Sequence, residues 1–249
     1  MNGDHFLGRA RELWVEAAGA AVEFPGAGEV NVVVSPGSQL CPPAWAGVVL
    51  LGGAGIATAP NARDAELLAD AVRKVAPASG LVDAGGLVGA LPVVDVLGPA
   101  SLLYLDRAAF LPHDGAAAVE EVAGDGAELA ALLDRVGAAD ADESGLADVT
   151  SPVFVVREGV HVVAAAGYQL WPRSVAQHGV LVAPGSRGRG LARTVASAAV
   201  AHALAAGLLP QWRARPEPSK RVALALGFRE AGSQVSVRLG GEEQAPGVR

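Results

Sequence analysis

A short stretch in the second half of the chain, residues 180–192, constrains the fold more than any other. It reads Val-Leu-Val-Ala-Pro-Gly-Ser-Arg-Gly-Arg-Gly-Leu-Ala, so an apolar run enters a glycine-rich turn that leads into an alanine-rich segment. Glycines let the backbone approach a ligand closely, and a helix starting after the turn would direct unpaired N–H groups and partial positive charge at it. This order predicts a phosphate-binding turn, to which Arg187 and Arg189 add positive charge.

Two other phosphate-binding patterns do not fit the chain. The turn lacks the lysine and the serine or threonine of a Walker P-loop, which argues against hydrolysis of nucleoside triphosphates. A second glycine cluster, residues 53–58, also follows an apolar run. There Thr58 replaces the third glycine of a dinucleotide fingerprint, and Pro60 delays the helix. We therefore expect no Rossmann-type site in the first half of the chain.

The apolar pattern around the turn predicts a run of strands and then an alternation of helices and strands. Three strands joined by short turns precede it and form an antiparallel meander, covering residues 153–157, 161–170 and 175–182. A helix, a strand, a second helix and a last strand follow, over residues 191–206, 208–215, 219–226 and 235–239. Upstream, Asp125 and Glu128 resemble a capping box that opens a helix through Val136, and an acidic segment follows this helix.

The first 110 residues have the pattern of a smaller unit of mixed helices and strands. Helices are predicted over residues 5–22 and 63–75, with Asn61 as the cap of the second. Strands are predicted over residues 29–34 and 101–105, with two more in the apolar run 45–59. The order loosely resembles that of the second half, so the unit could be a degenerate copy, although no motif supports this.

Composition and charge narrow the class of protein. Hydrophobic residues make up 51% of the 249 residues, enough for a core, and the formal net charge of −7 divides into −14 for residues 1–149 and +7 for residues 150–249. This asymmetry indicates two units and a polyanionic ligand for the basic one, or simply charge complementarity between the two. Aromatic residues are only 4% and the basic residues form no long run, so we expect no nucleic acid as a partner and favour a small phosphorylated cofactor.

Other classes are excluded by what the sequence lacks. A single cysteine, Cys41, excludes a disulfide framework and a cysteine-rich zinc site, and the five histidines lack metal-ligand spacing, so no metal is expected. The N-terminus has no signal-peptide pattern. The uncharged stretch between Glu29 and Arg63 is interrupted by Pro36, Pro42 and further prolines, so it does not predict a membrane span. We expect a cytoplasmic protein.

The turn resembles the motif of a known family. Arg187-x-x-Gly190-x-Ala192 matches the signature Gln/Arg-x-x-Gly-x-Gly/Ala that binds pyrophosphate in the GNAT superfamily of acyl-CoA-dependent N-acetyltransferases. The preceding Val-x-Pro, the helix ending in glycine, and Ser219 followed by Gly227-Phe228 are similar to the family's surrounding elements. The resemblance covers about half the chain, roughly residues 120–240. It implies an α/β (α+β) fold, a GNAT-type mixed, mostly antiparallel twisted sheet flanked by helices.

The resemblance also implies acetyl-CoA as co-substrate, held in a V-shaped opening between strands 175–182 and 208–215. The backbone of Leu181 and Val182 would bind the pantetheine arm, with the Val182 amide as an oxyanion stabiliser. A substrate amine would then attack the thioester directly, so that the protein mainly positions the two reactants. The residues expected to hold the cofactor are Leu181, Val182, Arg187, Gly188, Arg189, Gly190, Leu191, Ala192 and Ser219.

His178 is the predicted catalytic base, because it lies nine residues before Arg187, where some family members place a substrate-facing histidine. The alternative is a histidine packed within the strand, and Tyr168 could likewise line the acceptor pocket or simply pack. Two positions depart from the family pattern. Ala223 stands where many members carry a tyrosine that protonates the leaving thiolate, and Pro216 replaces a usual asparagine. Thiols have a pKa of about 8.5, so the thiolate can leave without that acid.

The sequence therefore predicts residues 1–110 as a smaller α/β unit, residues 111–241 as a GNAT domain, and residues 242–249 as a tail. The predicted activity is transfer of an acetyl group from acetyl-CoA to a primary amine, on a small molecule or a peptide. The alternative is a non-catalytic acyl-CoA-binding module with a regulatory or structural role. Arg213 and Arg215 could meet CoA phosphates or lie on a solvated surface. The acceptor and the oligomeric state, a homodimer or otherwise, stay open.

Overall fold

The computed structural model describes residues 5–75, 86, 89–124 and 126–240, which fall into two compact units. Unit 1 comprises residues 1–10 and 101–231, and unit 2 comprises residues 11–100 and 232–249. Strands β4 (Val93–Tyr104) and β10 (Arg229–Leu239) each run from one unit into the other. The expected domain boundaries after residues 110 and 241 stay predictions, because this division by compactness is discontinuous along the chain.

Unit 2 contains a small sheet with one amphipathic helix, α2 (Ala62–Lys74). Its strands lie in the order β1, β3, β2, β10, and only the β1–β3 pair is parallel. The bounds of the first three are Val30–Val34, Ala46–Leu51 and Ala54–Ala59. Asn61 caps α2 as predicted, since its side chain accepts a hydrogen bond from the N–H of Asp64 at 2.9 Å. Leu68 and Ala71 on α2 are fully buried in the core of this unit.

Helix α1 (His5–Ala18) is shorter than the predicted 5–22. Gly19 follows its end, and its φ of +64° suits a residue just past a helix end.

Unit 1 is built on the predicted antiparallel meander. Its strands lie in the order β4, β9, β8, β7, β6, β5, and all pair antiparallel except β8 with β9. The bounds are β5 Glu120–Val122, β6 Val153–Glu158, β7 His161–Trp171, β8 Val175–Val182 and β9 Leu209–Ala214. The helices are α4 Ala127–Val136, α5 Ala138–Ser144, α6 Leu191–Ala205 and α7 Glu217–Ala225. Short 3-10 turns cover Arg107–Ala109, Leu146–Asp148, Pro172–Ser174 and Pro184–Ser186.

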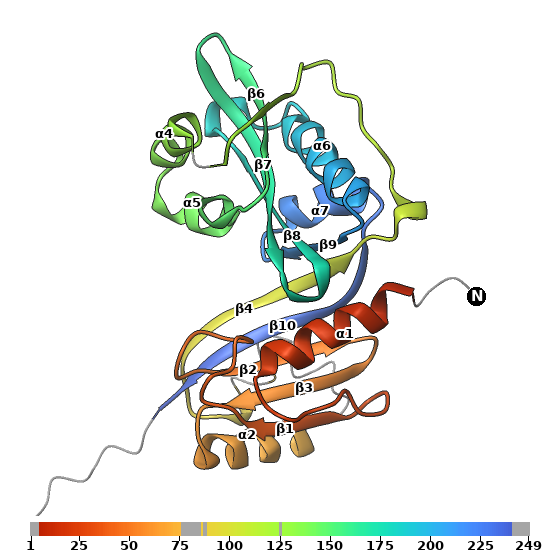
Figure 1. Cartoon of the computed structure of the whole chain (residues 1–249). Coiled ribbons are helices and arrows are strands. Elements are labelled where there is room, and N and C mark those ends of the chain that lie inside the picture. The colour runs from red at the N-terminus through yellow and green to blue at the C-terminus, as the bar shows by residue number, and fades with distance from the viewer. Residues whose placement is uncertain (1–4, 76–85, 87–88, 125, 241–249) are drawn as a thin grey trace, which may run out of the picture. The chain divides into compact units, whose positions relative to one another are not determined.

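The helices of unit 1 cover both faces of this sheet, with α4 and α5 on one side of β6–β8 and α6 on the other (Figure 1). Alternation along β8 assigns its side chains to these faces. Ala176 packs with Ala203 of α6, whereas Gly179 faces α5, because a Cβ on it would lie 2.4 Å from the carbonyl oxygen of Ser144. The predicted fold class, a mixed and mostly antiparallel sheet flanked by helices, is confirmed.

Two elements of unit 1 differ from the prediction. Helix α5 forms within the segment that we expected only to be acidic. Helix α4 begins at Ala127 with Gly126 as its N-cap and no side-chain cap, so the predicted capping box does not open it. Asp125 lies outside the described residues, and Glu128 makes a different contact.

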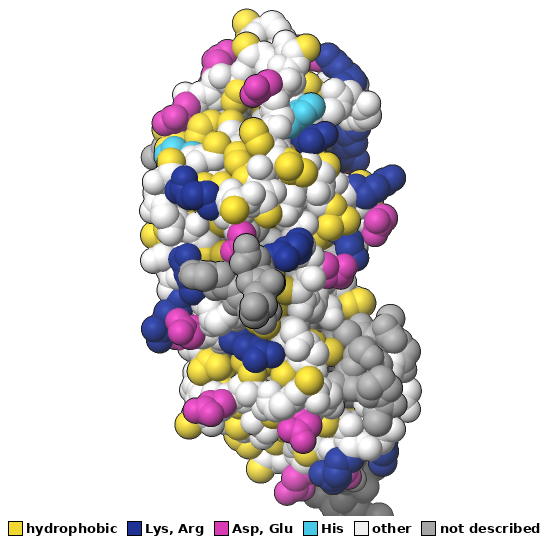
Figure 2. Space-filling view, turned by 90° about the vertical axis from the view of Figure 1, so that its right-hand side faces the viewer, with side chains coloured by type: hydrophobic (Ala, Val, Ile, Leu, Met, Phe, Trp, Pro, Cys, Tyr) yellow, Lys and Arg dark blue, Asp and Glu magenta, His cyan; other side chains and the backbone are white. Residues whose placement is uncertain are grey.

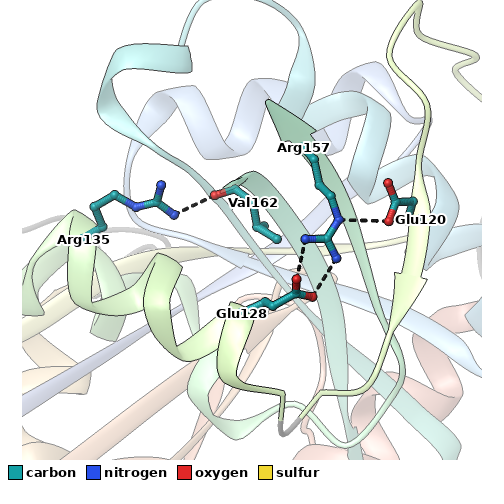
Figure 3. Close-up of polar contacts among 5 residues, drawn as sticks. All are labelled: Glu120, Glu128, Arg135, Arg157 and Val162. Atoms are coloured by element: carbon teal, nitrogen blue, oxygen red, sulfur yellow. Dashed lines mark hydrogen bonds and ion pairs between the residues drawn. The ribbon is translucent and has the colours of Figure 1, made fainter. Parts of the chain in front are cut away.

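That contact is an arginine-centred network that ties α4 and β5 to β6 (Figure 3). Arg157 of β6 donates two hydrogen bonds to the carboxylate of Glu128, both of 2.6 Å, and one of 2.9 Å to Glu120 of β5. Arg135 of α4 adds a bond of 2.8 Å to the carbonyl of Val162. The hydrogen bonds from Arg157 lower the pKa of Glu128, because they favour its ionised form.

Replacing Glu128 with glutamine should lower the thermal unfolding midpoint at pH 7. The difference from the unmodified protein should disappear as the pH falls below about 4, near the ordinary glutamate pKa. The reason is that a carboxyl with a lowered pKa in the folded state stabilises the fold above its unfolded-state pKa, and this contribution is lost on protonation. Thermal unfolding followed by circular dichroism from pH 3 to 7 measures this.

Glu121→Gln serves as the control, since Glu121 is exposed on β5 beside Glu120. An equal loss for Glu128→Gln at pH 3 and pH 7, or an equal effect of Glu121→Gln, would contradict an ionic role for Glu128.

Candidate active site

The site is organised by the place where two neighbouring strands stop pairing. Parallel β8 and β9 share three paired positions, and the last joins Gln177 to Gln211. Strand β8 nevertheless continues to Val182, with its other edge fully paired to β7. The edge of β8 beyond Gln177 therefore carries backbone groups that no neighbouring strand uses on the β9 side.

Two side-chain contacts mark the point where the pairing ends, one on each face of the sheet. On the α5 face, the Gln211 side-chain amide donates a hydrogen bond of 2.8 Å to the Gln177 oxygen. On the α6 face, the rings of His178 and Trp212 stack with centroids 6.2 Å apart and planes 18° apart. The two strands are thus joined by side chains at the last backbone pair and one residue beyond it.

The direction of the backbone groups along β8 follows from one hydrogen bond at its end. The N–H of Ala183 donates to Val163 of β7 at 2.8 Å. Because successive residues of a strand direct their backbone groups to opposite edges, Val180 and Val182 direct theirs toward the β9 side, and Leu181 directs its own toward β7. Of the two predicted pantetheine-binding residues, Val182 has the required direction and Leu181 does not.

The turn after β8 has the geometry expected of an anion site. Gly188 and Gly190 have φ of +76° and +79°, and Gly190 is the N-cap of α6 without any side-chain cap. A Cβ on either glycine would meet no atom within 4 Å, so the turn is open. The first N–H groups of α6, from Leu191 and Ala192 onward, have no acceptor within the helix and point toward this turn.

The arginines of the turn are held by carboxylates. Arg187 donates to Asp140 of α5 at 2.6 Å and to the carbonyl of Val182 at 3.2 Å, while Arg189 pairs with Glu158. Both ion pairs are largely exposed to solvent, and exposed pairs contribute only about 0.2–1 kcal/mol. A diphosphate at the turn could therefore compete with them for the arginines.

Pairs of this kind also explain the charge asymmetry of the sequence. Arginines from the basic part bind carboxylates from the acidic part, as in Arg157 with Glu128, Arg187 with Asp140 and Arg215 with Glu143. On the face seen in Figure 2, acidic and basic side chains of the described residues are interspersed. The complementarity alternative thus accounts for much of the asymmetry, and the charge total alone does not indicate a polyanionic ligand.

His178 is buried among aromatic rings on the α6 face. It is 4% exposed, its ring lies 5.5 Å from that of Tyr168, and neither of its ring nitrogens has a hydrogen-bond partner among the described residues. Burial lowers the pKa of His178 to about 3. The Tyr168 hydroxyl lies 2.9 Å from Nδ1 of His202 on α6. In this arrangement His178 is neutral and enclosed, which counts against a basic role, although its assignment as the base remains a prediction.

The second predicted helix, α7, contributes differently from what the motif suggests. The Ser219 hydroxyl accepts a hydrogen bond of 2.9 Å from the Trp212 indole, so it holds the ring that stacks on His178. Ala223 is fully buried and offers no acidic group. Ser219 therefore supports the end of the β8–β9 pairing, and its contact with a cofactor remains a prediction.

The rest of the described chain offers no competing centre. Burial raises the pKa of the Cys41 thiol to about 11, which opposes a nucleophilic role. Among the described residues, no three His, Cys, Asp or Glu side chains are grouped as a metal site would require. Within the same residues, the helices are too short or too polar to span a bilayer.

The sequence alone did not reveal the residues on the α5 face of the site. Helix α5 brings Asp140 and Glu143 to the ends of β8 and β9, where they pair with Arg187 and Arg215. No sequence motif predicts that Gln177 and Gln211 pair. The alternation of Gln211 and Arg213 with the apolar residues of β9 was the available signal, because it predicts a polar face on that strand.

Comparison with known proteins identifies the domain that carries this turn. Residues 153–233, from β6 into β10, match the family model described as GNAT acetyltransferase. This part of the chain is therefore a GNAT acetyltransferase domain, as the motif resemblance predicted. No curated protein matches the chain at a significant level.

Several solved structures similar to the chain are described as acetyltransferases. One, from Novosphingobium aromaticivorans and assigned to the GNAT family, is 22% identical with a TM-score of 0.46, over 58% of this chain and 65% of that one. A GCN5-related N-acetyltransferase from Kribbella flavida is 21% identical with a TM-score of 0.47, over 64% of each chain. An assigned acetyltransferase from Salmonella typhimurium, solved with its cofactor acetyl-CoA, is 23% identical with a TM-score of 0.31, over 40% and 70%. The chain thus spans less than two thirds of the first two.

Replacing His178 with leucine should remove a pH-dependent loss of stability. A folded-state pKa of about 3 lies below the ordinary 6.5, so below pH 6.5 only the unfolded chain takes up the proton. Stability is then complete above the unfolded-state pKa and falls by about 1.4 kcal/mol per pH unit as the pH drops toward 3.

Urea unfolding between pH 4 and 8 measures this slope, and His178→Leu should flatten it relative to the exposed control His161→Gln. An unchanged slope in His178→Leu would mean that His178 is already solvated in the folded state.

Proposed function

We propose that this protein transfers an acetyl group from acetyl-CoA to a primary amine, in a ternary complex at the divergence of β8 and β9. The observation that carries the proposal is the open, double-glycine turn at the start of α6, placed directly after the unpaired edge of β8. A diphosphate fits such a turn, because N–H groups and the helix dipole converge there. The family match of residues 153–233 supports the same activity.

In this proposal the pantetheine arm lies along β8. The backbone groups of Val180 and Val182 are directed to the β9 side, so they can bind the amides of the arm as an additional strand would. The N–H of Val182 is then the donor for the thioester oxygen, whose negative charge grows as the amine attacks. The open turn begins at Arg187, five residues after Val182. It holds the diphosphate through the backbone from Gly188 to Ala192 and through the side chains of Arg187 and Arg189.

The chemistry requires little of the side chains. The amine nitrogen forms a bond to the thioester carbon, the carbon–sulfur bond breaks, and a proton from the nitrogen ends on the sulfur or in solvent. A thiolate with a pKa of about 8.5 is a good leaving group, so the absence of an acid at Ala223 does not prevent the step. Positioning of the two reactants supplies the main rate enhancement.

The proton of the attacking amine needs an acceptor. His178 was predicted for this role, but a pKa of about 3 makes it a weak base for an ammonium group. If His178 is the base, its substitution abolishes acetyl transfer without weakening coenzyme binding. Transfer that survives its substitution would leave water as the acceptor.

A non-catalytic acyl-CoA-binding module is the second candidate. It is favoured by two features, the enclosed His178 and the buried Ala223. Each removes a group that the motif would assign to catalysis.

Thiol release distinguishes the two candidates. The purified chain is mixed with acetyl-CoA and a panel of primary amines, and free thiol is measured with a chromogenic disulfide. An acetyltransferase releases thiol in proportion to an acetylated amine, detected by mass spectrometry. Calorimetric binding of CoA without thiol release from any amine would support the binding module, and absence of CoA binding would contradict both.

Gly190→Ala should weaken CoA binding about tenfold, because a side chain in the left-handed region costs about 1–2 kcal/mol and rotates the N–H groups of the turn. Gly185→Ala is the matched control, since a Cβ there also meets open space and its φ is not positive. Calorimetric titration with CoA measures both. Equal affinities for the two variants would show that the turn does not hold the coenzyme.

The double variant Asp140→Asn with Glu158→Gln should bind CoA about two to five times more tightly, because it removes exposed ion pairs that compete for the arginines. The gain should shrink as salt is raised from 50 to 500 mM. Glu128→Gln, which frees no arginine near the turn, should leave the affinity unchanged. A double variant with unchanged affinity would exclude Arg187 and Arg189 from the diphosphate contact.

A further inference from the structure

A polar patch covers the α5 face of the sheet beside the point where β8 and β9 stop pairing. Strand alternation places Arg213 with Gln211 on this face, opposite Trp212, and the Gln211–Gln177 bond joins it to β8. Trp171 of β7 belongs to the same patch, because the Arg213 guanidinium carbon lies 5.6 Å from the centroid of its ring. The turn that binds the diphosphate in our proposal instead leads into α6 on the opposite face.

Two polar atoms of this patch are buried without a partner. Gln211 is 0% exposed, and while its amide nitrogen is bonded to Gln177, its oxygen Oε1 has no hydrogen-bond partner among the described residues. The same holds for Nε of Arg213, a donor. An unmet acceptor and an unmet donor thus lie two residues apart on one strand face, about 7 Å along the strand.

Arg213 also differs from its neighbours in charge compensation. Arg187, Arg189 and Arg215 each pair with a carboxylate, whereas Arg213 forms no direct ion pair with the described residues and lies against the face of Trp171. An unpaired, partly buried cation is costly, so natural proteins retain it mainly where an anion meets it. Burial, the largest effect, and the nearby Arg215 lower the pKa of Arg213, while the charge of Glu143, which is itself paired with Arg215, acts in the opposite direction.

We propose that Arg213 binds a carboxylate of the acceptor, and that Gln211 accepts a hydrogen bond from its amine, so that the acceptor is a short amino acid rather than a simple amine. Arginine suits this role because its planar fork matches a carboxylate with two hydrogen bonds. The inference rests on the proposed function, since it places the acceptor beside the thioester. It also accounts for an arginine on β9 that forms no direct ion pair with the described residues, two residues beyond the last paired residue.

Matched pairs of amines test the proposal by thiol release. Glycine and β-alanine are compared with glycinamide and 3-aminopropanamide, which replace the carboxylate with a neutral amide. The carboxylates should show a kcat/KM about tenfold to a hundredfold higher, the range of a charge-assisted hydrogen bond. Arg213→Met should reduce the ratio to about one. Arg221→Met, an exposed arginine on α7, should keep the preference.

A binding measurement keeps the test independent of turnover and of folding of the variant. N-acetylglycine and N-acetylglycinamide, the corresponding products, are titrated into the unmodified protein saturated with CoA, and the acid should bind about tenfold more tightly. Equal affinities, or a carboxylate preference that survives in Arg213→Met, would overturn the inference. If the amides release thiol as fast as the acids, the carboxylate inference is wrong and the proposed acetyl transfer still holds. If the protein does not bind CoA, the proposed acetyl transfer itself is wrong.

Discussion

The candidate site depends on the early end of backbone pairing between two parallel strands. Strands β8 and β9 share only three paired positions, and they are held there by a glutamine bond on one face and an imidazole–indole stack on the other. The groups assigned to the reaction lie at the last paired position or beyond it along the two strands. The unpaired edge of β8 offers backbone donors, the turn after it opens toward α6, and Arg213 follows on β9. In the proposed function, a single interruption of a sheet supplies both the coenzyme path and the acceptor position.

The electrostatics of the site are those of a balanced surface rather than a basic patch. The arginines near the turn are engaged by Asp140 and Glu158, and the neighbouring Arg215 by Glu143. Binding of a diphosphate would exchange these exposed pairs for stronger contacts to phosphate, at small net cost. The attraction for the coenzyme then comes chiefly from oriented N–H groups, which no carboxylate of the described residues occupies at the turn. Arg213, which forms no direct ion pair with the described residues, is the exception.

Much of this could be predicted from sequence, because the elements near the turn have strong local signals. Alternation predicted the strands of the meander, and the glycines of the turn predicted a backbone open to a ligand and the helix that follows. Other features have no local signal. The acidic segment forms α5 because its alanines favour a helix and its carboxylates find arginines far along the chain, as Asp140 finds Arg187. His178 lies on an apolar face only once β9 and α7 bring Trp212 and Phe228 beside it. Tertiary contacts of this kind cannot be deduced from spacing.

The route of the chain through the two units limits how it can be divided. The segment Ser101–Tyr104 of β4 pairs with β9 in unit 1, although the earlier part of the same strand belongs to unit 2. Conversely, residues 232–237 of β10 pair with β2 in unit 2, although that strand begins in unit 1. No single cut of the polypeptide therefore yields an intact half. A fragment that begins at residue 111 would lack β4, the strand that pairs with one edge of β9. It would also lack β2, with which β10 pairs. The segment before the acetyltransferase domain is therefore a structural part of it.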